Sequence, residues 1–144
     1  MSTQSVTIPS RSVDPLDLRD LKQLEDIGFM TAMTLVLLGN YAQTGHFGGP
    51  LAYTPFNVAM HLAGRERGGL HFDYRRPKHP YSDKFMLAAG HCAPTCYALW
   101  MSMGEALARK YAATGDRRYY VQPELAMLSV DALGFRRGRI QASL

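Results

Sequence analysis

Apolar residues recur at helical spacing in three segments of the chain, and polar or glycine-rich stretches separate these segments. In the first segment, apolar positions return every three or four residues, which is typical of a helix with one buried face. Asp14 and Pro15 mark its start, as N-cap residue and first helical residue. We therefore expect a helix from Pro15 to about Tyr41, with these core candidates: Leu18, Leu21, Leu24, Ile27, Met30 or Thr31, Thr34, Leu37 and Leu38.

The same spacing predicts two more long helices and one short helix. The second helix is expected over residues 50–63 and the third over residues 94–113, where Thr114-Gly115-Asp116 ends it. A short fourth helix is expected over residues 123–133. Apolar stripes on helices usually mean burial. The core candidates of the second and third helices are Leu51, Phe56, Val58, Met60, Leu62, Tyr97, Leu99, Trp100, Met103 and Leu107.

One short run has the pattern of a strand. Residues 85–88 are continuously apolar and follow a polar loop, residues 64–80, that glycine and proline interrupt. A turn and a long helix come next, which is the order found in α/β proteins. Because a single strand cannot make a sheet, its neighbours must come from the loops or from a larger α/β unit. We therefore expect an α/β fold that is rich in helices and has few parallel strands.

Length and composition favour one globular domain. Of the 144 residues, 47% are hydrophobic and 19% are charged, which is enough apolar material for a core. We expect residues 1–13, rich in Ser, Thr and Pro, to form a flexible arm, and residues 14–144 to form the domain. The net charge of +4 is mild, and the basic clusters at 75–76 and 136–139 lie far apart in sequence. We therefore expect no nucleic-acid partner.

Cysteine usage and hydropathy bear on the compartment. Cys92 and Cys96 lie four residues apart on the predicted third helix, and the chain has no other cysteine. This favours free thiols in a reducing cytoplasm over a disulfide framework. The longest apolar stretch, residues 30–39, is too short to span a bilayer, and the first fifteen residues lack the apolar core of a signal peptide. We expect no membrane partner.

Two glycine–histidine turns, residues 44–49 and 89–94, carry the candidate chemistry. Glycines in the first turn allow left-handed backbone and close approach of a ligand, and His46 is placed to exchange a hydrogen bond with a substrate hydroxyl or carbonyl. In the second turn, Gly90, His91 and the backbone N–H groups at the helix start can hold a diphosphate. The alternatives are an incidental histidine in a helix connection for His46 and a core histidine for His91.

Two other chemistries would use the second turn. His91, Cys92 and Cys96, with His79 upstream, are candidate zinc ligands, although the paired Cys-x-x-Cys spacing is absent. A helix start beside His91 is also the kind of environment that lowers the pKa of a thiol and makes it a nucleophile. No third group that would orient such a nucleophile is evident for Cys92 or Cys96.

Together the two turns resemble the N-terminal part of the transketolase family. That family carries Thr- or Ser-Gly-His-Pro-Gly-Gly after its first helix, and later Arg-Phe-Val-Leu-Ser-Lys-Gly-His-Ala before another helix. Here the first pattern is residues 44–49, with Phe47 in place of proline. The second is residues 83–94, with Ala89 in place of Lys, Asn or Ser before Gly90. The resemblance extends over roughly residues 16–107.

The resemblance implies an incomplete thiamine diphosphate-binding fold and an enzyme that transfers two-carbon ketol units between sugar phosphates. Thiamine diphosphate and Mg²⁺ would be its cofactors. By position, Gly90 and His91 would contact the cofactor diphosphate and His46 would bind the sugar-phosphate substrate, with both histidines acting in catalysis. The family's metal motif, Gly-Asp-Gly followed by Asn, is absent, so no metal ligand is assigned.

We therefore expect an N-terminal fragment or one subunit of a split transketolase-like transferase, inactive by itself. Its partner would be a second copy in a homo-oligomer or a complementary subunit that carries the rest of the enzyme. Alternatives within the same chemistry are a deoxyxylulose-phosphate synthase or a pyruvate dehydrogenase-like component. Outside it, the alternatives are a non-catalytic binding or interaction module and a zinc-bound domain.

Overall fold

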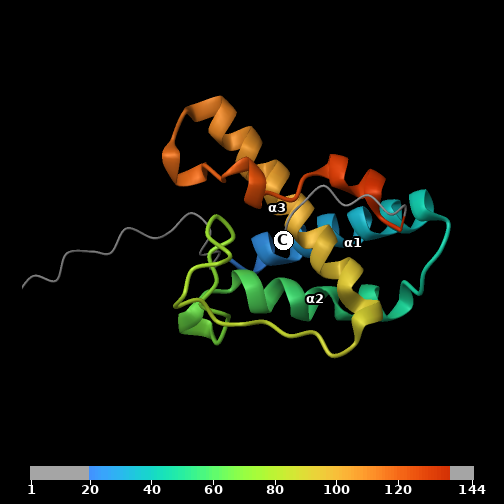
Figure 1. Cartoon of the computed structure of the whole chain (residues 1–144). Coiled ribbons are helices and arrows are strands. Elements are labelled where there is room, and N and C mark those ends of the chain that lie inside the picture. Colours follow the sequence, from blue (N-terminus) through green and yellow to red (C-terminus); the bar gives the residue numbers. More distant parts are fainter. Residues whose placement is uncertain (1–19, 137–144) are drawn as a thin grey trace, which may run out of the picture.

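Three long helices make up most of the computed structural model, which describes residues 20–136 (Figure 1). They are α1 (Leu21–Ala42), α2 (Gly48–Leu62) and α3 (Ala93–Thr114). The short 3₁₀ turns are η1 (Arg65–Arg67), η2 (Gly90–Cys92), η3 (Arg117–Tyr119), η4 (Pro123–Leu125) and η5 (Ser129–Gly134). Each long helix contacts the other two, so the three pack around a shared interior.

The expected α/β fold is wrong. Residues 20–136 contain no strand, and the run expected to form one, residues 85–88, is irregular and leads into η2. A strand exists only through hydrogen bonds to a neighbouring strand, and no described segment pairs with this run. The described part of the chain is therefore helical, without the parallel sheet of an α/β thiamine diphosphate-binding fold.

The first helix begins later than its pattern predicts and ends where expected. Asp20 has extended backbone and its side chain accepts a 2.9 Å hydrogen bond from the N–H of Lys22, so Asp20 is the N-cap of α1. The predicted cap, Asp14, and the arm, residues 1–13, lie outside the described residues. At the other end, Gln43 adopts left-handed backbone with φ 53°, which stops the helix after Ala42.

The second and third helices are confirmed to within two residues at each end, and Gly115, with φ 67°, ends α3 in left-handed backbone. The predicted fourth helix is wrong, because residues 123–133 form two separate 3₁₀ turns. Leu128 between them is extended, and its N–H donates to Oδ2 of Asp131 at 2.8 Å. This side-chain bond starts a new turn and competes with continuation of a helix.

The core lies among α1, α2, α3 and the loop that joins α2 to α3. Its largest cluster consists of Val58, Leu62, Tyr74, Leu99, Met103 and Leu107. Four predicted core residues are instead exposed: Leu21, Leu37, Leu51 and Phe56. Apolar residues surround α1, so periodicity alone does not select its buried face, which is formed by Thr31, Leu35, Leu38 and Ala42.

Polar side chains join α2 to α3 inside this core. The hydroxyl of Thr54 donates to the carbonyl of Pro50 at 2.9 Å and lies 2.9 Å from the hydroxyl of Thr95. Because Thr54 has one proton, Thr95 donates between the two hydroxyls. These bonds fix how the start of α3 sits on α2.

No helix in residues 20–136 has both the length and the apolarity to cross a membrane.

Candidate functional site

The two glycine–histidine turns meet where α2 and α3 begin, side by side in Figure 1. A Cβ atom built on Gly49 would lie 3.1 Å from Nε2 of His91 and 3.3 Å from Sγ of Cys92. Such distances are tighter than ordinary van der Waals contact, so residue 49 must be small for the imidazole to lie there. Residues from two distant segments thus share one surface.

Phe47, the departure from the family's proline, anchors the first turn. A Cβ atom on Gly39 would lie 2.8 Å from ring carbons of Phe47, and one on Gly45 would lie 2.5 Å from the nearest of them. Gly45 also has φ 133°, which residues with a side chain rarely adopt. The ring therefore folds back on the end of α1 and leaves His46 exposed.

Both predicted histidines, His46 and His91, are exposed, and so is Gly90. His91 is therefore not a core histidine. The structure brings His91 against the first turn through Gly49, whereas His46 lies in that turn itself. The surface that results is open to solvent and reachable by a ligand.

The helix starts at this surface have no capping side chain. Neither Phe47 before α2, nor Ala89 before η2, nor Cys92 before α3 caps its helix with a side-chain hydrogen bond. The first turns of α2 and α3 also contain no acidic residue. Backbone N–H groups at uncapped helix starts favour anions. At the start of α3 the N–H groups of Cys92 and Ala93 already donate to the carbonyls of Ala89 and Gly90, and Pro94 has no N–H, so an anion there would be held from Gly90 and His91. The arrangement can therefore bind an anionic group such as a phosphate.

Arg136 adds a positive charge that sequence reasoning missed. Its Nη1 donates to the hydroxyl of Thr44 at 3.2 Å, which ties the described C-terminal end to the first turn. The guanidinium carbon lies 5.9 Å from the ring centroid of the neighbouring Phe135. No local pattern predicts the contact with the first turn, because ninety-two positions separate Arg136 from Thr44.

The two cysteines are free and buried. Burial, together with neighbouring Cys92, raises the pKa of Cys96 to about 11. A thiol with that pKa stays protonated near neutral pH and is a poor nucleophile, which argues against catalysis by Cys96. Among residues 20–136, no group of three His, Cys, Asp or Glu side chains is arranged to hold a metal ion.

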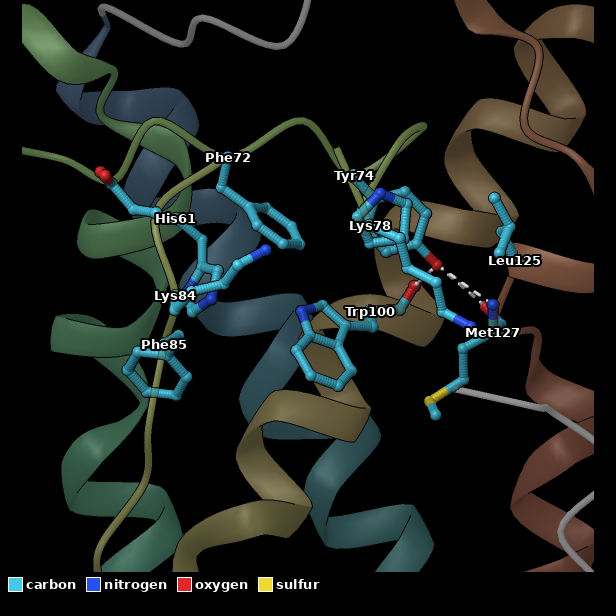
Figure 2. Close-up of a pocket in the computed structure, with 11 residues that line it drawn as sticks. His61, Phe72, Tyr74, Lys78, Lys84, Phe85, Trp100, Leu125 and Met127 are labelled. Atoms are coloured by element: carbon cyan, nitrogen blue, oxygen red, sulfur yellow. Dashed lines mark hydrogen bonds between the residues drawn. The ribbon is translucent and has the colours of Figure 1, made fainter. Parts of the chain in front are cut away.

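A separate cavity of about 260 Å³ lies at the opposite end of α2 (Figure 2). Its wall is formed by His61 of α2, Trp100 of α3 and residues from the two segments on either side of α3. None of the predicted site residues lines it. The residues around it are His61, Phe72, Tyr74, Pro77, Lys78, Asp83, Lys84, Phe85, Trp100, Leu125 and Met127.

Two buried nitrogen atoms at this cavity have no hydrogen-bond partner among the described residues: Nε2 of His61 and Nε1 of Trp100. Nδ1 of His61 lies 2.9 Å from the carbonyl oxygen of Asn57. Because a carbonyl only accepts, Nδ1 carries the proton of the neutral ring and Nε2 is left as an acceptor. Burial lowers the pKa of His61, which keeps the ring neutral near pH 7. The cavity thus offers one acceptor and one donor.

The sequence contains a partial signal for this cavity. Helical spacing places His61 three residues after Val58, on the buried face of α2, and a buried histidine needs polar partners. Trp100 is one of the predicted core residues, and in the structure its side chain is half-buried. The lysines come from an irregular loop whose path no periodicity predicts.

Comparison with known proteins adds no family to this description. No protein-family model, curated protein or solved structure matches the chain. The resemblance to transketolases therefore rests on the residues of the two turns.

Proposed function

We propose that this chain supplies part of a diphosphate-binding site to a transketolase-like, thiamine diphosphate-dependent transferase. One observation carries the proposal: Gly49 of the first turn lies against His91 of the second. The two motifs that resemble the family thus form one exposed surface. Arg136, bonded to Thr44 of the first turn, adds positive charge to it.

The described residues fit the diphosphate end of the cofactor. The starts of α2 and α3 have neither capping side chains nor acidic residues in their first turns, and such ends favour anions. Gly90 and His91 would hold the diphosphate there. No Mg²⁺ ligand is assigned to the described residues. Thiamine diphosphate, when bound, supplies the electron sink for cleaving and forming carbon–carbon bonds in sugars.

The two histidines would act on the substrate side of this site. An imidazole nitrogen can donate a hydrogen bond to a sugar oxygen or accept its proton. His46 would bind and orient the sugar phosphate. His91, held against Gly49, would keep its position beside the reacting region.

The proposed assembly needs more polypeptide than residues 20–136 provide. A complementary subunit, further sequence or a second copy would complete the site, in a reducing cytoplasm where Cys92 and Cys96 stay as thiols. The isolated chain would bind thiamine diphosphate weakly and would not turn over sugar phosphates. Without a metal clamp, most of the local positive charge of such sites is missing.

Amide-resolved NMR tests the proposal on the chain as it exists. Titration with inorganic diphosphate, and then with thiamine diphosphate and Mg²⁺, should shift the amide signals of Gly48, Gly49, Gly90 and His91, with millimolar affinity. The variant His91→Ala should lose most of this response. The matched control is His71→Ala, because His71 is exposed and lies outside both turns. Shifts spread over lysines and arginines elsewhere, or equal responses in both variants, would contradict the proposal.

A further inference from the structure

The cavity at the end of α2 has an aromatic floor. The imidazole of His61 packs edge-on against three aromatic rings. The distances from its ring centroid are 5.5 Å to Phe72, 5.0 Å to Phe85 and 6.4 Å to Trp100. A volume of about 260 Å³ is just below the roughly 300–1,000 Å³ of most small-molecule sites. The space and its apolar walls therefore suit a ligand with a single aromatic ring.

A polar pair lies in this apolar floor. Nε2 of His61 is an acceptor and Nε1–H of Trp100 is a donor, and both are buried without a partner among the described residues. His61 is only 6% exposed, so bulk water does not satisfy it. A hydroxyl group can accept from the indole N–H or donate to the imidazole. A single bound water has the same capacity, and this makes it the competing occupant.

Positive charge lies around the same space. Lys78 and Lys84 both line the cavity, and neither has a hydrogen bond or ion pair within residues 20–136. Figure 2 shows Lys84 on the side of His61 and Lys78 on the side of Met127. The carboxylate of Asp83, which also lines the cavity, already accepts a 2.7 Å hydrogen bond from the N–H of His71. Either ammonium group can therefore bind a carboxylate on a ligand.

We propose that this cavity binds a small aromatic carboxylate that carries a hydroxyl group on its ring. The ring lies on Phe72, Phe85 and Trp100, the hydroxyl bonds to Trp100 or His61, and the carboxylate pairs with Lys78 or Lys84. The site is at the far end of α2 from the glycine–histidine turns, so it stands independently of the proposed transferase function.

Trp100 gives a direct readout, because it is the only tryptophan in the chain. Its fluorescence should change saturably on titration with 4-hydroxyphenylacetate. Phenylacetate lacks the hydroxyl, and tyramine replaces the carboxylate with an ammonium group. Both should bind about tenfold more weakly or worse, since each loses one of the two polar interactions.

Two surface variants assign the carboxylate without disturbing the core. Lys78→Gln combined with Lys84→Gln should weaken 4-hydroxyphenylacetate binding about tenfold and should leave tyramine no weaker. Lys110→Gln, an exposed lysine on α3 outside the cavity, should change nothing. Equal affinities for the three probes, which is the result expected if water occupies the polar pair, would overturn the proposal. So would the absence of any saturable signal.

Discussion

At Gly104 the backbone of α3 lies directly against the segment that follows η4. A Cβ atom built there would overlap the carbonyl oxygen of Met127 and lie 3.0 Å from the hydroxyl oxygen of Tyr74. Because the obstacle is backbone, it cannot rotate away. We expect Gly104→Ala to lower the free energy of unfolding by about 1–3 kcal/mol, measured by urea denaturation.

Gly28 in α1 is the matched control for this substitution. No atom lies within 4 Å of a Cβ built on it. Alanine at a helical position is favoured over glycine by about 0.5–1 kcal/mol, so Gly28→Ala should stabilise the protein. The packing argument fails if both variants change stability in the same direction.

The buried imidazole of His61 makes stability depend on pH. Burial lowers its pKa in the folded state, whereas the unfolded chain keeps the ordinary value of about 6.5. Below that value the unfolded state takes up a proton that the folded state does not, so stability is complete above about pH 6.5 and falls as the pH drops further. Urea denaturation at about pH 7.5 and about pH 5.5 measures this difference. His61→Phe should reduce this difference in stability, and an equal difference in the parent chain and the variant would refute the assignment.

Among single residues, the sequence indicates His46 and His91 as candidate site residues because a glycine precedes each of them. It missed His61 and Arg136 for a physical reason. The environment of a buried histidine, and the contact of Arg136 with Thr44, depend on segments that are distant along the chain. The residues next to His61 and Arg136 in the sequence do not indicate which distant segments these side chains contact.

At the scale of elements, the contact between the two turns makes a direct prediction. Gly48 and Gly49 are adjacent at the start of α2, yet only a side chain at residue 49 would meet His91. We expect Gly49→Ala to shift the imidazole NMR signals of His91 and to weaken diphosphate binding, because the ring must move. Gly48→Ala, with nothing within 4 Å of its Cβ, should leave those signals unchanged. Identical spectra for the two variants would show that the turns do not meet.

The helices were predictable because their signals are local. Apolar spacing, Gly115 and the two prolines near the helix starts all act within a few residues, and α2 and α3 appear where they indicate. The strand expected over residues 85–88 is absent from the structure, since four apolar residues also suit an irregular segment packed on a helix. The predicted α/β class is therefore wrong because a sheet requires hydrogen bonds between two segments, and the sequence of one segment does not indicate its partner.

At the scale of the whole molecule, α1 leaves an apolar face uncovered by the described residues. Phe29, Met33 and Leu37 are 66%, 45% and 63% exposed, and their spacing of four residues places them on one side of the helix. Large exposed apolar patches mark interaction sites. This face supports the proposed need for a second copy or a complementary subunit.

Sedimentation velocity tests this face as an interface. We expect the chain to self-associate at micromolar concentration, and Phe29→Ser combined with Leu37→Ser to shift it toward the monomer, because both changes remove apolar area from the interface. Met86→Ser is the control, since Met86 is also exposed but lies in the loop between α2 and α3. A monomeric parent chain, or an equal response to the control, would count against this interface.

Because Cys92 and Cys96 are buried, the reactivity of their thiols reports local opening at the start of α3. Both thiols face the junction with α2, where Sγ of Cys96 donates to Oδ1 of Asn57 at 3.7 Å and Sγ of Cys92 lies beside Gly49. The chain has no other sulfhydryl, so alkylation by iodoacetamide in native buffer can proceed only when these two helices separate locally. The labelling rate would therefore time, without any engineered probe, how often the two glycine–histidine turns come apart.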